Sequence, residues 1–438
     1  MMLHVLEEIL RRRCSEGWLV GGTVRDRRSG RSSPDLDVIV ADDPAEVARE
    51  VSSSLRSPWF ALSARHGAYR VLGGEGHMDV AAMRGAGILE DLALRDFTVN
   101  AMAVPVRGGA EDEVLDPFGG REHLAAHLLV AVSDNIFRDD PLRLMRAVRF
   151  SHLLGFRMDA DLEGMLRAQA GELARSAPER IVAELALILD GGASASAVRR
   201  LEGSGLLQVF MPEAVAGDPS DALDALDGIL VSRSWPERSW AALLDKRMTI
   251  PADGTLSRPA ALRLAVLLRL VSPVAVASIG RRLKLSGMAI SLLQTVSTWQ
   301  QRVGGAGAMG LGGLAAAVMT PRASTTFFWD TAPWEPEVVL VAAADAAADC
   351  GMPGVEACAA LAPGSAAAVL LDRWADRLAG LPDPPFDGTL LMEVLGLTQG
   401  PELGRVLRDT RLAWEAGEIH TLDEALDLAR AARASLPG

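Results

Sequence analysis

The 438-residue sequence predicts a multidomain α+β protein in which a mixed α/β part precedes a long all-helical part. Strand-like runs of apolar and β-branched residues are confined to the part before residue 130. Beyond that point, apolar residues recur at helical spacing almost without interruption. A hydrophobic content of 49% over this length is also too much for one compact core, which predicts several domains.

The first part alternates predicted strands and helices. In chain order we expect a helix over 1–13, strands over 18–20 and 36–40, a helix over 42–55, strands over 69–72 and 77–81, and a strand over 101–106. The two runs 69–72 and 77–81 flank the glycine-rich stretch 73–76, which favours a hairpin.

The second part is predicted to be helical. The segments with helical spacing are 142–153, 160–190, 195–207, 259–270, 286–302, 365–380, 403–416 and 422–432. Gly155 is expected to end the first of these helices, and Thr421 to cap the last. A glycine cluster over 304–313 predicts a loop.

Charge and cysteine content limit the function classes. Three scattered cysteines give neither a disulfide framework nor zinc-ligand spacing, which favours a reduced, cytoplasmic location. No run is long enough for a membrane helix. A net charge of −13 means that a polyanionic partner would need a locally basic surface. Two sets of arginines could supply it, although charge alone favours pairing with nearby acids: Arg11, Arg12, Arg13, Arg25, Arg27, Arg28 and Arg31, then Arg138, Arg143, Arg146, Arg149 and Arg157.

The most informative feature is a set of carboxylates on predicted strands. Asp35 and Asp37 are two residues apart, so an extended chain projects both from one face. Such close like charges predict a divalent-metal site, because Mg²⁺ prefers carboxylate and phosphate oxygens. Asp79, on a later strand between apolar neighbours, is the candidate third acid. Two metal ions held here could activate a hydroxyl and stabilise a leaving oxygen.

A pair of glycines strengthens this hypothesis. Gly21 and Gly22 follow an apolar run and precede the two aspartates by about a dozen residues. Without side chains, they would let backbone amides approach a triphosphate. Each pattern is weak alone, and their order and spacing make the combination specific.

Four motifs together resemble the class II tRNA nucleotidyltransferase and bacterial poly(A) polymerase family. They are residues 19–26 followed by Asp35-Leu36-Asp37, residues 95–102, residues 116–120, and residues 139–150. The resemblance is dense over 18–213 and thin over 214–380. It implies a polymerase-β-like nucleotidyltransferase head over 1–130, with a mixed sheet and helices, then an all-α neck over 131–213, body over 214–380 and tRNA-binding tail over 381–438.

The resemblance also implies roles for individual residues. Asp35 and Asp37 would hold two Mg²⁺ ions, with Mn²⁺ as an alternative, and Asp79 would complete the catalytic acids. The residues implied to bind the nucleotide are Gly21, Gly22, Arg25, Arg95, Asp96, Asn100, Asp140, Arg143, Arg146 and Arg149. Among these, Asp140 and Arg143 would read the edge of the incoming base, since residues i and i+3 share one helical face.

The sequence departs from the family pattern at three places. Leu94 stands where the family usually has a second arginine, and Asp139 where it usually has glutamate. Only a short stretch follows Arg84 before the second motif, whereas A-adding members usually carry a long flexible loop there. The resemblance therefore implies addition of the two cytidines only.

The predicted function is template-independent addition of nucleotides from CTP, and ATP as a further substrate, to the 3′ end of tRNA with release of pyrophosphate. Full CCA addition, A-only addition and poly(A) polymerisation stay open. A nucleotidyltransferase of small molecules is disfavoured because the likeness extends into the helical half, and a non-catalytic RNA-binding relative because both Asp35 and Asp37 are present. Neither a membrane nor DNA is expected as a partner.

Overall fold

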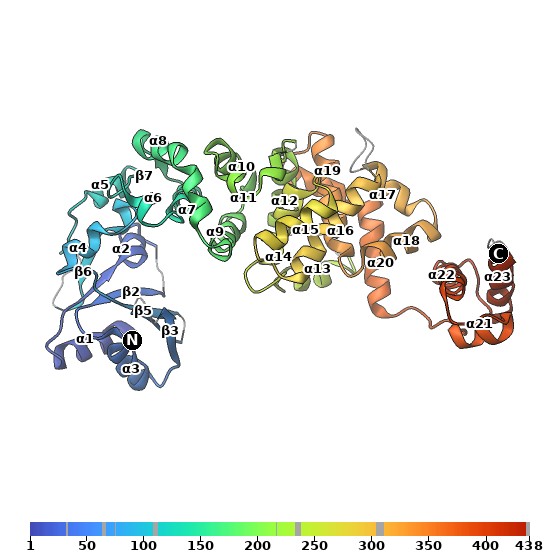
Figure 1. Ribbon diagram of the computed structural model, residues 1–438, viewed down its shortest axis with the longest axis horizontal. Helices are drawn as coiled ribbons and strands as arrows, with labels where there is room; N and C mark the ends of the chain where they lie inside the picture. The colour runs from blue at the N-terminus through green and yellow to red at the C-terminus, as the bar shows by residue number, and fades with distance from the viewer. Residues whose placement is uncertain are drawn as a thin grey trace. The chain divides into compact units, whose positions relative to one another are not determined.

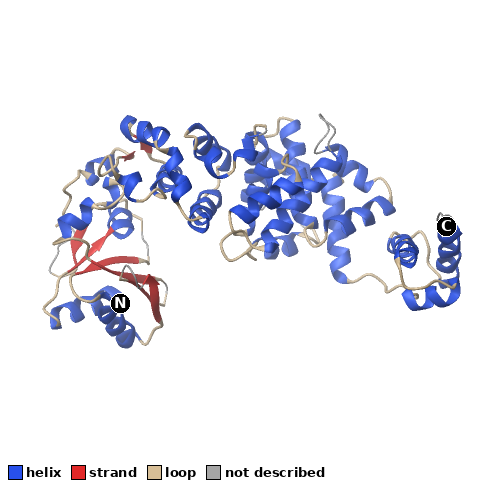
Figure 2. Ribbon diagram, viewed as in Figure 1, coloured by secondary structure: helices blue, strands red, loops and turns tan. Residues whose placement is uncertain are grey.

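The chain forms two compact units. A computed structural model describes residues 1–438 except 32–33, 64–66, 75, 108–112, 216, 233–237, 304–310 and 435–438. The first unit comprises Met1–Ser176 and Ser204–Val209, and the second comprises Ala177–Gly203 and Phe210–Gly438. The described strands all lie in the first unit, whereas the second is built from helices (Figures 1 and 2).

A six-stranded sheet organises the first unit, with strand order β3-β4-β5-β2-β1-β6. Its strands are β1 (Gly17–Val20), β2 (Leu36–Val40), β3 (Trp59–Ser63), β4 (Ala68–Leu72), β5 (His77–Ala82) and β6 (Ala103–Pro105). Neighbours pair antiparallel except β2 and β5, which run parallel in the middle of the sheet. This one parallel pair brings together two strands that are separated by a helix and a hairpin.

Two helices cover one face of this sheet, below it in Figure 1. Helix α1 (Met2–Arg12) buries Leu6, Ile9 and Leu10, and packs against α3 (Pro44–Leu55). Helix α3 starts where the carboxylate of Asp43 accepts a hydrogen bond from the amide of Ala45, with proline in its first turn. It then packs on β4 and β5.

The opposite face carries short helices. Helix α2 (Gly21–Arg28) leaves directly from β1, and α4 (Ile88–Ala93) and the 3₁₀ turn η2 (Thr98–Asn100) follow β5. A buried cluster on this face includes Trp18, Ile39 and Leu92. Since side chains along a strand alternate between faces, Asp37 projects to the same side as Ile39.

The rest of the first unit is mostly helical. Its elements are α5 (Gly120–Ala125), β7 (Leu128–Leu129), α6 (Ile136–Asp139), α7 (Arg143–Leu154), β8 (Arg157–Met158), α8 (Ala160–Ala168) and η3 (Ala170–Arg175). The short strands β7 and β8 pair parallel to each other. Gly155 ends α7 in the left-handed conformation, with φ of 69°, as the sequence predicts.

The second unit consists of packed helices. They are α9 (Pro178–Asp190), α10 (Ser194–Gly203), α11 (Leu206–Phe210, begun in the first unit), η4 (Pro212–Val215), α12 (Ser220–Ser232), α13 (Ala241–Met248), α14 (Arg258–Leu268), α15 (Pro273–Arg282), α16 (Gly287–Val303), α17 (Leu311–Val318), α18 (Pro321–Thr331), α19 (Glu335–Asp349), η5 (Gly354–Leu361), α20 (Ala366–Ala379), α21 (Gly388–Leu395), α22 (Pro401–Glu415) and α23 (Leu422–Ala434). Within the described residues, no single helix meets the length and apolarity of a membrane span; α19 and η5 do so only as a pair bent by 119°.

A buried ion network connects three helices of this unit. The carboxylate of Glu337 on α19 is fully buried and accepts hydrogen bonds from Arg258 on α14, at 2.7 Å, and from Arg247 on α13, at 2.7 and 2.9 Å. The buried carboxylate is thus paired with opposite charge, as a buried ion requires.

The structure confirms most predicted elements. The hairpin forms from β4 and β5, although Glu75 in its turn lies outside the described residues. Thr421 caps α23 together with Glu424, whose carboxylate accepts from the Thr421 amide at 3.2 Å. The loop predicted over 304–313 falls mostly outside the described residues, and its last residues belong to α17 instead. The four-part division at 130, 213 and 380 stays a prediction.

Candidate active site

The parallel pair β2–β5 brings the predicted acids together. Asp37 lies directly opposite Asp79 in the strand register, so both carboxylates stand on the same face of the sheet. Asp35 sits just before β2 and has a side chain that is 49% exposed, compared with 24% for Asp79. The three carboxylates thus gather at the centre of the sheet, on the face opposite α1 and α3.

An arginine on the neighbouring strand neutralises one of these acids. Arg70, opposite Asp79 in the β4–β5 register, donates to it through Nε at 2.7 Å and Nη2 at 2.8 Å. Its hydrogen bond to Asp79 raises the pKa of Arg70, and the charges of Asp79, Asp35 and Asp37 raise it further. The guanidinium therefore lies within the field of all three carboxylates. The sequence argument left Asp79 without a partner.

A histidine orients Asp35. The backbone amide of His77 donates to Asp35 Oδ1 at 3.1 Å, and its ring Nδ1 lies 2.7 Å from the same oxygen. The ring Nε2 lies 3.8 Å from Asp79 Oδ2. His77 therefore links two of the three acids, a role that sequence analysis missed; the strand alternation of 77 and 79 was the available signal.

The glycine turn fits closely around Asp37. Gly21 has φ of +59°, and a Cβ atom there would lie 3.4 Å from Asp37 Oδ2 and 3.1 Å from Arg95 Nη1. A Cβ atom on Gly22 would lie 3.2 Å from the same aspartate oxygen. Both glycines thus allow the turn to lie close to Asp37, and the glycine at 21 also allows the left-handed backbone conformation.

The surroundings of Asp37 disfavour its ionised form. Burial, then the charge of Asp79, raises the pKa of Asp37, while Arg95, the Gly22 amide and Arg25 act in the opposite direction. The amide of Asp37 donates to the Thr23 hydroxyl at 2.6 Å, which fixes the strand to α2. A cation placed beside this carboxylate would favour its ionised form.

A chain of polar contacts runs from α2 to α7. Arg25 donates to Asn100 Oδ1 at 2.7 Å, and Asn100 donates to Asp96 Oδ1 at 3.1 Å. Arg146 donates to Asp96 Oδ2 through Nε at 2.8 Å and Nη2 at 2.6 Å. Burial alone would raise the pKa of Asp96, yet Arg146 and the hydrogen bonds from Asn100 and Phe97 lower it overall. Asp96 is thereby held ionised as the centre of a scaffold.

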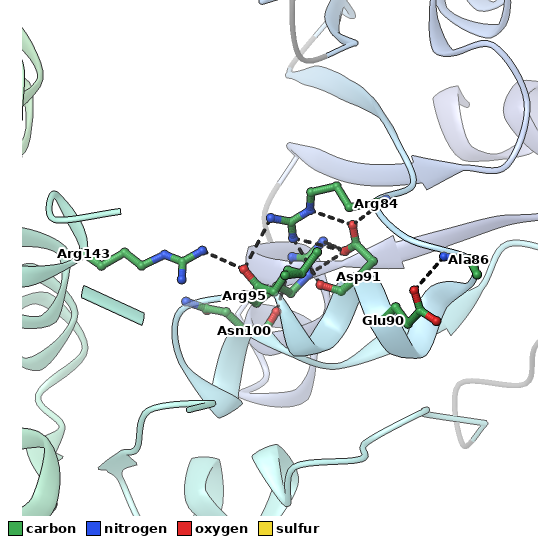
Figure 3. Close-up of polar contacts among 8 residues, drawn as sticks. Arg84, Ala86, Glu90, Asp91, Arg95, Asn100 and Arg143 are labelled. Atoms are coloured by element: carbon green, nitrogen blue, oxygen red, sulfur yellow. Dashed lines mark hydrogen bonds and ion pairs between the residues drawn. The ribbon is translucent and has the colours of Figure 1, made fainter. Parts of the chain in front are cut away.

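A second cluster fixes the segment after β5 (Figure 3). The fully buried carboxylate of Asp91 accepts from Arg84 at 2.9 Å and from Arg95 at 3.1 Å. Burial would raise the pKa of Asp91, but the two arginines lower it overall. Glu90 accepts from the Ala86 amide at 2.8 Å. We name Arg84, Asp91 and Arg95 the arginine clamp; sequence analysis predicted only Arg95 as a site residue.

The predicted base-reading pair does not share a helical face. Asp140 has extended backbone, with φ of −145°, and helix α7 begins only at Arg143. The cause is Pro141, since the residue before a proline is driven out of the helical region. Asp140 caps the turn by accepting from the Leu142 amide at 3.2 Å. The i,i+3 argument was therefore wrong, whereas the role of the pair stays a prediction.

Arg143 instead reaches back to the clamp segment. Its Nη2 donates to the Leu94 carbonyl at 2.6 Å, and Arg84 Nη1 donates to the same oxygen at 3.4 Å (Figure 3). The remaining two predicted arginines stand around Phe150, with the guanidinium carbons of Arg146 and Arg149 at 5.2 and 4.5 Å from the ring centre. Phe150 lies on α7 itself, so α7 is held against the head by the bonds of Arg143 to Leu94 and of Arg146 to Asp96.

The donor set fits a divalent cation only in part. Among the described residues, no group of three or more histidine, cysteine, aspartate or glutamate side chains is arranged to hold a metal ion. Asp35 and Asp37 nevertheless supply hard oxygen donors, and burial together with the charge of Asp79 raises the pKa of Asp37, an effect that a bound cation would oppose. Two carboxylates suffice where substrate phosphates complete the coordination.

Comparison with known proteins gives the family. Residues 17–130 match the model of the poly A polymerase head domain, and residues 155–217 match that of a probable RNA and SrmB-binding site of polymerase A. The CC-adding tRNA nucleotidyltransferase of Geobacter sulfurreducens is 31% identical over 93% of this chain and 90% of its own length. The chain belongs to the tRNA nucleotidyltransferase family.

Other members of the family differ in product. An A-adding tRNA nucleotidyltransferase of Deinococcus radiodurans is 37% identical over 44% of this chain and 45% of its own. A CCA-adding enzyme of Geobacillus kaustophilus is 33% identical over 46% and 52%. A solved CCA-adding enzyme with ATP has a TM-score of 0.70 at 20% identity, covering 98% of this chain and 94% of its own, which confirms the predicted fold class. Accordingly this tRNA nucleotidyltransferase is an enzyme of the class that extends tRNA 3′ ends.

Proposed function

We propose that this tRNA nucleotidyltransferase adds only the two cytidines of the CCA end. One observation carries the proposal: the connection between β5 and α4 is only Met83–Gly87, and the arginine clamp ties it, through Arg84, to Asp91 on α4. A connection that reshapes the base pocket between C and A needs freedom to move. Here it is tied by a buried carboxylate and, through Leu94, to Arg143.

The relatives' names alone do not decide between products. The relatives named above as CC-adding, CCA-adding and A-adding all match the chain at 31–37% identity. The short clamped connection is what favours CC addition, since it removes the expected lever without disturbing the acids or the glycine turn.

The proposed reaction is an in-line attack of the tRNA 3′-hydroxyl on the α-phosphate of CTP, with pyrophosphate as the leaving group. Asp35 and Asp37 would hold the divalent ions, and those ions supply activation of the hydroxyl and charge neutralisation when bound. Gly21 and Gly22 admit the triphosphate close to the backbone. Arg70 and His77 hold the acids in place, and the ion pair with Asp91 holds Arg95 near Asp37.

Base selection is assigned to the start of α7. Asp140 and Arg143 offer an acceptor and a rigid fork of donors, respectively, next to the clamp segment. Because Arg143 already donates to the Leu94 carbonyl, its orientation depends on that segment. A fixed segment therefore predicts one fixed base preference.

The test is the length of the product. Transfer RNA lacking its CCA end is incubated with Mg²⁺ and CTP, ATP or both, and the 3′ ends are sequenced. We expect two added cytidines with CTP, the same product with both nucleotides, and no extension of tRNA ending in CC by ATP. A third added nucleotide would refute CC-only addition, and adenosine runs would indicate poly(A) synthesis. Absence of any incorporation would support a non-catalytic RNA-binding relative.

A further inference from the structure

A basic pocket lies in the first unit beside the candidate active site. It has a volume of 370 Å³ and is lined by residues of α2, α5 and the end of α7. Four arginines contribute to it, Arg25, Arg28, Arg31 and Arg121, together with His127. Among the described lining residues there is no acid, although the chain as a whole carries a net charge of −13.

Several arginines near the start of the chain are paired with acids. Arg13 is bonded to Asp42 at 2.5 Å and also to Glu50, and Arg11 lies 3.8 Å from Glu8. For Arg11, Arg13 and Arg25, which lies 2.9 Å from Asp26, the expectation of pairing with nearby acids is confirmed. Arg28 and Arg31 line the pocket from the last turn of α2 and the residues after it.

The lining of the pocket also includes apolar side chains. They are those of Leu124, Leu154 and Phe156, and the ring of His127 packs edge-on against Phe156 at 5.5 Å between centroids. A lining that combines cationic and apolar side chains suits a ligand that carries both a phosphate and a sugar or base. The volume exceeds what a lone phosphate group needs, which favours a nucleotide unit.

Two observations favour RNA as the source of that phosphate. The segment that matches an RNA-binding family model starts at residue 155 and so includes Phe156. Arg25 also lines the pocket while donating to Asn100 in the active site, so the two sites share one side chain. The glycine turn and Asp37 lie at the beginning of α2, whereas the pocket lies at its end.

We infer that this pocket holds a phosphodiester-linked nucleotide of the tRNA substrate, apart from the seat of CTP. The inference rests on tRNA being the substrate of the proposed function. An acidic chain repels RNA at long range, so a concentrated local cluster is needed to bind its backbone. The pocket would fix the position of the acceptor strand relative to Asp35 and Asp37 rather than take part in the chemistry.

The test removes three charges from the pocket and leaves Arg25 intact. The full-length R28Q/R31Q/R121Q variant is compared with R11Q/R167Q/R175Q, a control that changes the net charge equally at exposed arginines of the same unit, each 62–65% exposed. We measure the KM for tRNA lacking CCA, the KM for CTP, kcat, and tRNA affinity between 50 and 300 mM salt.

We expect the pocket variant to raise the KM for tRNA about ten-fold or more and to lower the salt slope of log Kd by about two, at roughly 0.7–0.9 per lost phosphate contact. Its kcat and KM for CTP should be unchanged, and the control should behave as the parent. Equal effects in both variants, or no effect in the pocket variant, would overturn the inference.

A second measurement distinguishes a phosphate of the tRNA backbone from the phosphates of CTP or pyrophosphate as the occupant of the pocket. Inhibition by added pyrophosphate is measured for the parent and the pocket variant. A change in pyrophosphate inhibition or in the KM for CTP, with the KM for tRNA unchanged, would overturn the RNA assignment. If the triple variant misfolds, as judged by circular dichroism, exposed Arg121→Gln alone should still raise the KM for tRNA about two-fold. The length of the product is measured separately. If the enzyme does not stop after two cytidines, the effect of the pocket variant on the KM for tRNA can still be interpreted.

Discussion

Two groups of buried charged residues in this protein have different roles, one structural and one in the candidate active site. Around Glu337 in the second unit, one fully buried carboxylate accepts hydrogen bonds directly from two guanidinium groups. Around Asp37 in the first unit, Arg70 bonds Asp79, whereas burial and the charge of Asp79 raise the pKa of Asp37 against the opposing charges of Arg95 and Arg25. Burial of charge therefore does not by itself mark a functional site. A buried carboxylate whose pKa stays raised is the better indicator, because a bound cation would stabilise its charged form.

The sharpest test of the comparison is Asp37→Ala. We expect nucleotide incorporation to fall by about 10³-fold or more, since the cation-binding carboxylate is lost, while tRNA affinity persists. Incorporation of labelled CTP and tRNA binding are measured on the same preparation. Asp43→Ala, which removes only the cap of α3, is the control and should cost about 1 kcal/mol of stability without loss of turnover. Turnover retained in Asp37→Ala would reject the metal assignment.

The second test removes the buried charge of Glu337 in the second unit. Glu337→Gln should lower the free energy of unfolding by about 3–5 kcal/mol, because the buried guanidinium of Arg258 and the partly buried one of Arg247 lose their shared counter-charge. Urea unfolding followed by circular dichroism measures it. Glu163→Gln removes the carboxylate of an exposed pair with Arg167 and should change stability by less than about 0.5 kcal/mol. Equal shifts for both variants would contradict the structural role, whereas kcat at 20 °C should stay unchanged in each.

The third test separates crowding from backbone strain. Gly21→Ala and Gly192→Ala both place alanine at positive φ, +59° and +70°, and each should cost about 1 kcal/mol of stability. Only at Gly21 would the new methyl meet Asp37 and Arg95, whereas nothing lies within 4 Å at Gly192. We therefore expect kcat/KM for CTP to fall about ten- to hundred-fold in Gly21→Ala alone. Similar activity losses in both variants would show that strain, not proximity to the acid, is responsible.

The smallest expected effect concerns the arginine clamp. Arg84→Ala leaves Asp91 with Arg95 alone and frees the connection after β5, so the preference for CTP over ATP should fall several-fold, corresponding to about 1 kcal/mol. Competition between the two nucleotides on tRNA lacking its CCA end measures it. Glu90→Gln keeps an acceptor for the Ala86 amide and should not change the preference. An unchanged preference in Arg84→Ala would show that the clamp does not govern base choice.

Sequence reasoning reached the acids and glycines because their signals are local. The period of two placed Asp35 and Asp37 on one face, and the alternation around Asp79 placed it on a strand that turned out to pair beside them. Arg70 and the clamp residue Asp91 were not predicted, since an ion pair between strands or segments depends on tertiary approach. The prediction that Asp140 and Arg143 share a helical face was wrong because the helical period was extended across Pro141.

The parallel pairing of β2 with β5 has a further consequence for how this chain tolerates changes in length. Inserting or deleting one residue within β5 moves every later side chain of that strand to the other face, and position 79 would then point toward α3. Changes in the connection between α3 and β3, at 56–58, carry no such penalty, because loop closure depends only weakly on length. Natural and engineered insertions and deletions should accordingly occur in the loops that connect the central strands, whereas the number of residues within those strands stays constant.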